Sequence, residues 1–393
     1  MKVNIERIKE NLLEMSEVAN AENNGYTRLA FSKEEKAALE WLKGKLDDLE
    51  VSVSEDAVGN VFGRIGALNQ PAIAFGSHLD TVREGGLYDG AIGVIVGLEC
   101  LQVLKEHGYP LDIPLELICF VGEEANPLGG TFGSRAIAGL IDEEQLPKSF
   151  TSFPFTREDV FKVKVPKEAY RHFLELHIEQ GSVLEENQNQ IGIVHSIAGI
   201  KRLNIHIKGK ASHSGTTPMN LREDALVRAS SLILQVNKLA RESTDDIVAT
   251  IGKVTVLPNS ENVVPGEVQL TLEMRGSNIR EIENFETNIR NWISDNCIAH
   301  IYNGVQKKPQ TLSKEVQQSI EKSCTRQNLS YQSIISGANH DANSMTNISD
   351  VGMIFIPSKD GLSHHPEEFS SWEDIEAGAN TMLYTLLDLS KLD

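Results

Sequence analysis

The apolar residues of the first 180 positions recur with two different periods. Spacings of three or four residues predict an amphipathic helix near 3–20 and another that begins at Ser32, where Glu35 stands at the position that completes a capping box. Short apolar or alternating runs predict strands, and a longer apolar run that stops at Gly108 predicts a buried helix. The expected strands are 51–53, 60–65, 72–75, 115–121 and 173–178, and the expected buried helix is 91–107. Strands that alternate with helices predict an α/β layer fold.

The pattern changes near residue 197, where a separate block of elements begins. This block is predicted to contain strand 201–208, helix 222–241, strands 247–256 and 267–274, and helix 279–293. The βαββα order predicts a small α+β sandwich at 197–308. Because the α/β pattern returns with a strand at 351–356 and a helix at 372–389, we expect the sandwich to be inserted into a mixed-sheet domain made of 1–196 and 309–393.

Composition restricts the partners of the chain. Its 393 residues leave room for roughly two domains, and 37 Lys and Arg against 56 Asp and Glu give a formal charge of −19. Such a surface repels nucleic acid and anionic lipid, so we expect neither as a partner. The four cysteines are scattered, the N-terminal stretch lacks the apolar core of a signal peptide, and no apolar run is long enough to cross a bilayer. These features predict a cytoplasmic protein.

The candidate chemistry begins in the run Gly-Ser-His-Leu-Asp-Thr-Val at 76–82. Period two places His78 and Asp80 on the same side of an extended segment, and a histidine held by a carboxylate is how proteins orient a metal-binding imidazole. Asp89 follows in a glycine-flanked loop, and the adjacent Glu123 and Glu124 come after another apolar strand. Open α/β sheets bind ligands at the carboxyl ends of strands. The arrangement therefore predicts a metal-dependent hydrolase, with one glutamate as a ligand and its neighbour as a proton carrier.

Two further histidine motifs are ambiguous when read from the residues alone. His177 lies in a Leu-His-Ile-Glu run, where a structural role and a ligand role are equally plausible. His364 and His365 stand side by side before Pro366, so either of them, or neither, could bind a metal.

Motifs spread over most of the chain resolve this ambiguity. The stretches concerned are 76–82, 85–90, 123–124, 133–136, 176–181, 212–219, 262–265, 274–275, 336–342 and 361–366. Taken together, they resemble the co-catalytic aminoacylase and carboxypeptidase-type metallohydrolases. More narrowly, they resemble the hydantoinase/carbamoylase amidases, which include N-carbamoyl-L-amino-acid hydrolases, allantoate amidohydrolases and β-ureidopropionases of the yeast type. The form His-Ile-Glu-Gln-Gly at 177–181 favours this branch over the aminoacylases, which place an acid at the first position.

The resemblance implies a metal centre with two divalent ions, which could be Zn, Mn, Co or Ni. It implies that His78, Asp89 and His177 bind one ion, and that Asp89, Glu124 and His364 bind the other. Asp89 would bridge the two ions. His364 is preferred to His365 because the family writes this motif as Ser-His-x-Pro.

The resemblance also implies roles for residues that do not bind metal. It implies Glu123 as the general base, Asp80 as a catalytic-site residue beside His78, and His213 as the donor that stabilises the oxyanion, reaching the site of a partner subunit. The predicted small domain would act as a lid and as the interface of a homodimer. The expected substrate-binding residues are Asn262 and Arg275, which would hold a carboxylate, and Gln180 and His340, which would line the pocket.

These expectations combine into a binuclear metal-dependent amidohydrolase. Its substrate would be a small linear amide or ureido compound with a carboxylate, such as an N-carbamoyl-L-amino acid or an allantoate-like compound. Residues 125–128 depart from the family pattern, which often has an arginine after the acidic pair, and Asn339 stands where the family has a glycine. Both the acyl group and the amine part of the substrate therefore stay open. The alternatives are an N-acyl-amino-acid deacylase, a metallo-dipeptidase, or a catalytically inactive homologue that binds metabolites.

Overall fold

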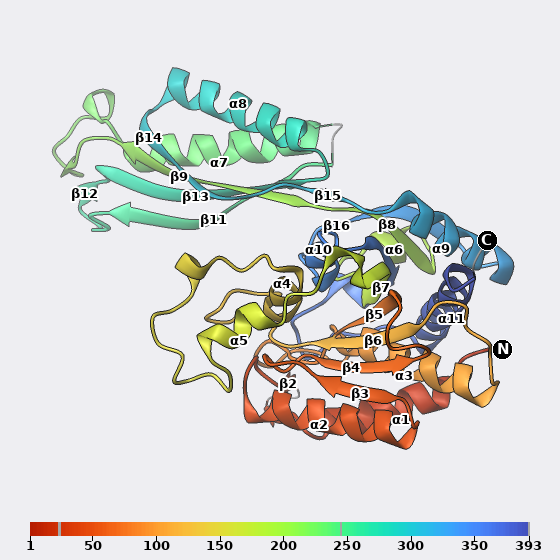
Figure 1. Ribbon diagram of the computed structural model, residues 1–393. Helices are drawn as coiled ribbons and strands as arrows, with labels where there is room; N and C mark the ends of the chain where they lie inside the picture. The colour runs from red at the N-terminus through yellow and green to blue at the C-terminus, as the bar shows by residue number, and fades with distance from the viewer. Residues whose placement is uncertain (23–24, 244–245, 392–393) are drawn as a thin grey trace. The chain divides into compact units, whose positions relative to one another are not determined.

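The computed structural model describes residues 1–22, 25–243 and 246–391 (Figure 1). The predicted domains also contain 23–24, 244–245 and 392–393, which lie outside the described residues. The described residues form two compact units, one made of Met1–His195 and Leu312–Asp393, the other of Ser196–Thr311. Each unit has a hydrophobic core of its own.

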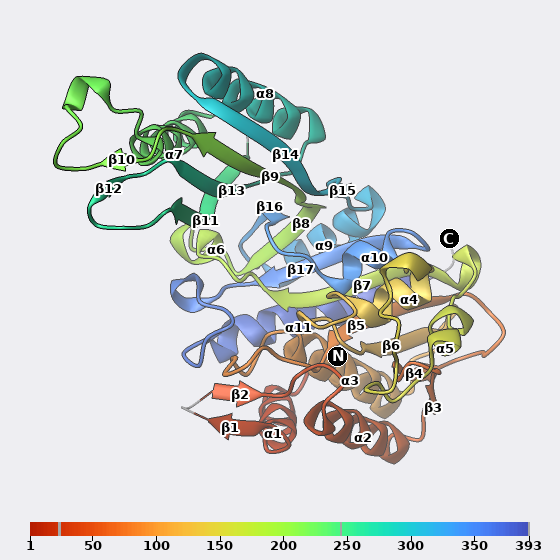
Figure 2. The same cartoon turned by 90° about the vertical axis from the view of Figure 1, so that its left-hand side faces the viewer.

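A mixed β-sheet forms the centre of the first unit (Figures 1 and 2). The strand order is β8–β17–β7–β5–β6–β4–β3, with β16 paired to β8. The bounds are β3 (Ser52–Glu55), β4 (Val61–Ile65), β5 (Ala72–His78), β6 (Leu115–Phe120), β7 (Tyr170–Ile178), β8 (Ile191–Ile197), β16 (Tyr331–Ser336) and β17 (Asp350–Ile356). The strands β6, β5, β7 and β17 are mutually parallel, whereas β3–β4, β4–β6 and β8–β17 are antiparallel pairs. The prediction of a mixed-sheet α/β fold is confirmed.

Helices cover this sheet, and the sequence predicted the longest of them. They are α1 (Ile5–Ser16), α2 (Lys33–Asp48), α3 (Ala91–Glu106), α4 (Phe132–Ala138), α5 (Arg157–Lys162), α6 (Val183–Glu186), α9 (Lys314–Gln327), α10 (Asp341–Met345) and α11 (Trp372–Leu389). The helix α1 is shorter than predicted, because the chain leaves the helix after Ser16 and forms the hairpin of β1 (Asn20–Glu22) and β2 (Gly25–Thr27). In the described part of the chain, no helix is both long and apolar enough to cross a membrane.

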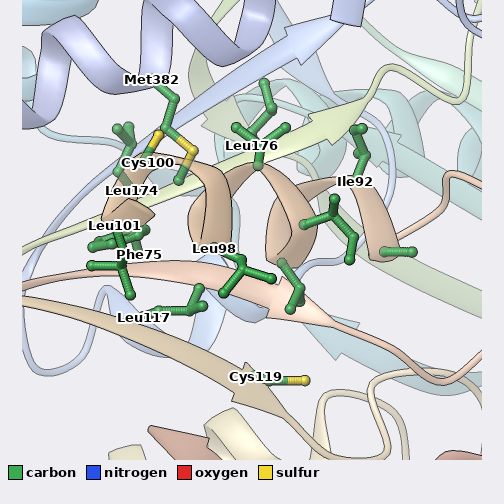
Figure 3. Packing of buried hydrophobic residues seen from close by; sticks show 14 of the residues in the cluster. Phe75, Ile92, Leu98, Cys100, Leu101, Leu117, Cys119, Leu174, Leu176 and Met382 are labelled. Atoms are coloured by element: carbon green, nitrogen blue, oxygen red, sulfur yellow. The ribbon is translucent and has the colours of Figure 1, made fainter. Parts of the chain in front are cut away.

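The helix α3 is buried on almost every side, which explains its continuous apolar sequence. Figure 3 shows Leu98 and Leu101 of α3 near Phe75 and Leu117 of the sheet, while Met382 of α11 packs from the opposite side. The helix and the sheet approach each other closely at Gly97, where a Cβ would lie 2.5 Å from Cδ1 of Leu117. Truncating one such buried leucine to alanine costs about 2–5 kcal/mol. This packing fixes the end of β5 that carries the first candidate ligand.

The first turn of α2 differs from the prediction in one respect. Ser32 caps the helix by accepting a hydrogen bond from the Glu35 N–H at 3.2 Å. The carboxyl group of Glu35 does not return to Ser32 to complete a capping box, because the Ser32 N–H donates to the carbonyl of Leu29. Glu35 accepts instead from the N–H groups of Phe31 and Gly122. The prediction of a complete capping box is therefore wrong: the serine half forms, but the carboxyl group of Glu35 makes a tertiary contact instead.

In residues 196–243 and 246–311, four strands form an antiparallel sheet in the order β11–β13–β9–β14. The bounds are β9 (Gly199–Lys208), β11 (Val248–Leu257), β13 (Glu267–Gly276) and β14 (Ile298–Lys307), with α7 (Ala225–Glu242) and α8 (Ile279–Asn296). Both helices pack on the same face, where every second residue of β13 is buried (Figure 1). The opposite face is polar and half-exposed. The predicted α+β class of this unit is confirmed.

The strand β14 was missing from the predicted βαββα order. It contains Asn303 and Gly304, which are residues typical of turns, and its pairing with β9 shifts register between Asn303 and Gln306. Three short strands lie outside the sheet of this unit: β10 (Ser212–His213) pairs with β12 (Val263–Val264), and β15 (Gln310–Thr311) pairs with the end of β8.

Candidate metal centre

The candidate ligands meet where parallel strands of the first unit end. His78 is the last residue of β5, and His177 is the second-last residue of β7. Glu124 follows β6, and Asp89 lies in the loop that leads from β5 into α3. Because parallel strands place their carboxyl ends at one edge of the sheet, the ends of β5, β6 and β7, which are far apart in the sequence, converge here.

Asp89 lies at the centre of this group, and its two oxygens face different histidines. Oδ1 lies 3.2 Å from Nε2 of His177 and 3.6 Å from Nε2 of His78. Oδ2 lies 3.4 Å from Nε2 of His364. The neighbouring Gly90 has φ +65°, and a Cβ there would lie 2.3 Å from the His78 ring, so this loop requires glycine.

Both buried imidazoles are oriented through their Nδ1 atoms. Nδ1 of His78 lies 3.0 Å from the carbonyl oxygen of Asp80, and Nδ1 of His177 lies 2.9 Å from the carbonyl oxygen of Ile178. A proton on Nδ1 satisfies these contacts and leaves the Nε2 lone pair directed at Asp89. The Gly90 N–H donates to Nε2 of His177 at 3.2 Å, which requires the same tautomer. The rings are therefore held in the orientation that a metal ligand needs.

A second group of donors lies on the other side of Asp89. Nε2 of His364 is 3.2 Å from Oε1 of Glu124, and Asp89, Glu124 and His364 together form a group with the spacing of metal ligands. His364 is 48% exposed at its side chain and has φ +56°. Nδ1 of His365 accepts from the Glu367 N–H instead. The structure thus brings His364, and not His365, to Asp89.

The chemistry and spacing of these donors fit divalent cations. Two ligands that each lie about 2.1 Å from one ion at a tetrahedral angle are about 3.4 Å apart, and the distances around Asp89 run from 3.2 to 3.6 Å. Imidazole and carboxylate donors suit Zn, Mn, Co or Ni. Several acids are buried around the donors, and a buried acid cluster requires a compensating positive charge. The buried acids around the donors include Asp80, Asp89, Glu124, Glu175, Asp341 and Glu368.

Asp80 connects the histidine and the acidic pair. Its Oδ1 accepts from the Glu123 N–H at 3.1 Å, and its Oδ2 accepts from the Glu124 N–H at 3.0 Å. Oδ1 also lies 3.4 Å from Nδ1 of His78. Glu124 belongs to the second donor group, whereas Glu123 stays outside it with Oε2 3.7 Å from Nε2 of His78. The two adjacent acids thus occupy different positions at the site.

The pKa values of the site groups are strongly perturbed. Burial, together with repulsion by Asp341 and Glu124, raises the pKa of Glu123 well above its ordinary value, although His78 acts in the opposite direction. Burial acts to raise the pKa of Asp89, but the neighbouring histidines lower it well below the usual range. Hydrogen bonds to Asp89 and Glu124 raise the pKa of His364 to about 10. Such clusters of perturbed groups are typical of functional sites.

Gln180 and His340 also lie at this centre. Nε2 of Gln180 donates to Oδ2 of Asp89 at 2.7 Å, and its Oε1 is buried without a hydrogen-bond partner among the described residues. His340 is buried with its ring centroid 4.5 Å from that of His177. With Glu175 and His177 it forms a third group that has the spacing of metal ligands.

Three residues that hold the centre together were absent from the predictions. Oε1 of Glu368 accepts from the Asp89 N–H at 3.0 Å, and Ser363 donates to Oδ2 of Asp89 at 2.7 Å. Glu175 accepts from the Ser77 hydroxyl at 2.7 Å and from the Ala342 N–H at 2.8 Å. Glu175 stands two residues before His177 on the same strand, so period two could have revealed it. Glu368 is 279 positions from Asp89, and no local pattern indicates the contact.

The predicted site residues of the second unit fall into two separate places. His213 of β10 and Asn262 are neighbours, because the Ser214 N–H donates to the Asn262 carbonyl at 2.9 Å. Both side chains are exposed. Arg275 of β13 pairs with Ile200 at the start of β9, and its Nε donates to Glu273 at 2.8 Å. The structure therefore does not bring Asn262 and Arg275 together within this unit.

Comparison with known proteins agrees with this fold and site. Residues 74–388 match the model of the peptidase family M20/M25/M40. The chain is 36% identical to an N-carbamoyl-L-amino-acid amidohydrolase of Paenarthrobacter aurescens over 99% of both chains. It is 33% identical to an allantoate amidohydrolase of Bacillus subtilis over 94% of this chain and 93% of the relative. A hydantoinase/carbamoylase family amidase of Burkholderia multivorans superposes with a TM-score of 0.90 at 29% identity, covering 98% of each chain.

The fold, the donor groups and these relatives define the protein as a metal-dependent amidohydrolase, as predicted. The chain belongs to the peptidase family M20/M25/M40. The predicted resemblance to the hydantoinase/carbamoylase amidases is confirmed.

Proposed function

We propose that this protein uses two divalent ions to hydrolyse an N-carbamoyl-L-amino acid or a related ureido acid such as allantoate. The observation that supports two ions is the position of Asp89. One of its oxygens faces His78 and His177, and the other faces His364. The names of the relatives from Paenarthrobacter aurescens and Bacillus subtilis support the choice of substrate.

In this proposal, His78, Asp89 and His177 hold one ion, and Asp89, Glu124 and His364 hold the other. When bound, such ions polarise a substrate carbonyl and lower the pKa of water. Asp80 keeps the His78 ring and the backbone of both glutamates in place. Gln180 donates to Asp89 and lies where it can also contact a substrate, while His340 lines the same buried region.

Glu123 is proposed as the general base. It stands beside the donor groups without belonging to one, so its carboxylate is available to accept the proton of the attacking water and to deliver it to the leaving nitrogen. The water oxygen forms a bond to the carbonyl carbon, and the carbon–nitrogen bond then breaks. With an N-carbamoyl substrate, the products are ammonia, carbon dioxide and the free amino acid.

The second unit is proposed to supply substrate-binding groups and a dimer interface, with 197–308 as a lid and dimerisation domain beside a catalytic domain of 1–196 and 309–393. Arg275 suits a substrate carboxylate, and His213 suits the oxyanion. Positions 200 and 208 of β9 are separated by about 27 Å at the rise of an extended strand. Arg275 lies at the first end, and His213 with Asn262 follows the second.

A small substrate cannot touch both ends of this sheet at once. The two groups are therefore proposed to serve different copies of the site, which requires a homodimer. The mass of the purified protein in light scattering tests this directly, and a monomer at assay concentration would contradict it. A cytoplasmic location is also proposed, since Cys100, Cys119 and Cys324 are buried as free thiols.

A substrate screen tests the proposed reaction. The purified protein is loaded separately with Mn, Co and Zn and assayed for amine and ammonia release from N-carbamoyl-L-amino acids, allantoate, N-formyl and N-acetyl amino acids, and dipeptides. We expect one ureido acid to give the highest kcat/KM. Preference for N-acetyl amino acids or dipeptides would replace the proposal by a deacylase or a dipeptidase. The Asp89→Asn variant serves as the control, because it must lose activity with every substrate.

A further inference from the structure

Two buried charged residues in the segment 28–35 have no role in the proposed reaction. Arg28 is 2% exposed and Glu35 is 3% exposed. Charged side chains are almost never fully buried unless they have partners, so both positions require an explanation. Their partners belong to the two loops that carry Asp80 and the acidic pair.

Glu35 holds the turn that leads into the acidic pair. Its Oε1 accepts from the Gly122 N–H at 2.9 Å, and its Oε2 accepts from the Phe31 N–H. Gly122 directly precedes Glu123 and has φ +62°. A Cβ at Gly122 would lie 2.8 Å from the ring of Phe31, so the segment 28–35 packs tightly against this turn.

Arg28 holds the backbone that carries Asp80. Its Nε donates to the carbonyl oxygen of Leu79, which lies between His78 and Asp80 in the chain. The Arg28 N–H donates to Oγ1 of Thr81 at 2.8 Å, and the Thr81 N–H donates to the Arg28 carbonyl at 2.8 Å. Arg28 is thus hydrogen-bonded to Leu79 and Thr81, the residues on both sides of Asp80.

These contacts complete a row of hydrogen bonds behind the acidic pair. The N–H groups of Gly122, Glu123 and Glu124 donate in succession to Glu35, to Asp80 and again to Asp80. Two buried carboxyl groups from separate segments therefore fix three consecutive residues. The guanidinium of Arg28 interacts electrostatically with both carboxyl groups.

We propose that Arg28 and Glu35 are positioning residues that hold the turn Gly122–Glu124 in its reactive geometry, Glu35 directly and Arg28 through Asp80. The proposal rests on the function proposed above for Glu123 and Glu124. It differs from a purely structural role because one of the two bonds of Glu35 is with Gly122, the residue next to the proposed general base. A displacement of about 1 Å at such a site can cost about 100-fold in rate.

The Glu35→Gln variant tests this proposal in the full-length, metal-loaded protein. Glutamine has one acceptor oxygen, so only one of the Phe31 and Gly122 N–H groups keeps its partner. We expect kcat to fall by about 10- to 100-fold with KM changed by less than about threefold. In hydrogen exchange read by mass spectrometry, we expect peptides that cover Phe31 and 121–126 to exchange faster, while the rest of the first unit is unchanged.

The matched control is Glu34→Gln, which removes the same charge from the same helical turn. Glu34 pairs only loosely with Lys33, at 3.7 Å, so the control should keep the wild-type kcat and exchange. A Glu35→Gln protein with wild-type kcat, or with faster exchange throughout the first unit, would overturn the proposal. If the wild type hydrolyses none of the substrates, the proposed function fails, and the exchange measurement still decides whether Glu35 holds the turn.

A second variant covers the case in which Glu35→Gln does not fold. Arg28→Lys keeps a buried positive charge but cannot reach the Leu79 carbonyl with the geometry of a guanidinium. The expected result is again a fall in kcat with little change in KM, and faster exchange confined to peptides that cover 79–81 and 121–126. Unchanged kcat and exchange in this variant would overturn the role of Arg28.

Discussion

The candidate ligands of the first unit and the predicted substrate-binding residues of the second are held in different ways. Around Asp89, the donors are largely buried. Local carbonyl oxygens orient the rings of His78 and His177, and Asp89 itself is held by Glu368 and Ser363 from a distant segment. In the second unit, His213 and Asn262 are exposed. Among the described residues, the ring of His213 has only one hydrogen bond, a local one that its Nδ1 accepts from the Gly215 N–H. The first arrangement is preorganised by the chain itself, whereas His213 and Asn262 in the second are exposed and held by local contacts.

This difference predicts that the largest effects on turnover arise in the first unit. The Glu123→Gln variant keeps the shape of the side chain but cannot accept a proton, so we expect kcat to fall by at least about 100-fold. Metal content by elemental analysis should stay at the wild-type level, since Glu123 lies outside the donor groups. Near-normal turnover in this variant would show that another residue acts as the base.

The two adjacent histidines at 364 and 365 allow a matched test of metal binding at the exposed side of the centre. His364→Ala removes a donor next to Asp89 and Glu124, so metal affinity should fall by more than the 10- to 100-fold typical of losing an outer contact. His365→Ala is the matched control and should bind metal like the wild type. Titration of the metal-free proteins with Mn measures both. Equal affinity in the two variants would remove His364 from the site.

Smaller effects are expected in the second unit, where they should appear in KM. Arg275→Gln removes a charged donor for a substrate carboxylate, so we expect KM to rise by about 10- to 100-fold with kcat nearly unchanged. Arg202→Gln is the control, because Arg202 pairs with the same Glu273 at 2.5 Å but is not predicted to bind substrate. If both variants raise KM equally, the general charge of this face, and not Arg275 itself, attracts the substrate.

Local patterns carried only part of the information about the centre. His78 and Asp80 were singled out because period two places them on one side of an extended segment after an apolar run, whereas His177, near the end of β7, was assigned only through the family motif. His364 required the family motif, since its contact with Asp89 bridges 275 positions of the chain. Arg28 and Glu368 were missed because their contacts with the site segments are long-range and leave no periodic trace in the sequence.

Glu35 shows how a correct local pattern can suggest the wrong contact. Ser32 and Glu35 have the spacing of a capping box, and half of that motif forms. The carboxyl group nevertheless accepts from the Gly122 N–H, 87 positions away, because the first turn of α2 and Phe31 lie beside the turn that follows β6. Similarly, β14 was not predicted because Asn303 and Gly304 are typical of turns. Its extended conformation depends on pairing with β9.

Gly90 has a consequence for how this protein can change over evolutionary time. Its backbone conformation disfavours any side chain, and the space that a methyl group would need is filled by the His78 ring. Even the smallest replacement would therefore displace a donor. Adaptation to a new substrate has to arise at positions that are free to vary, such as the exposed Ala125 and Pro127 after the acidic pair.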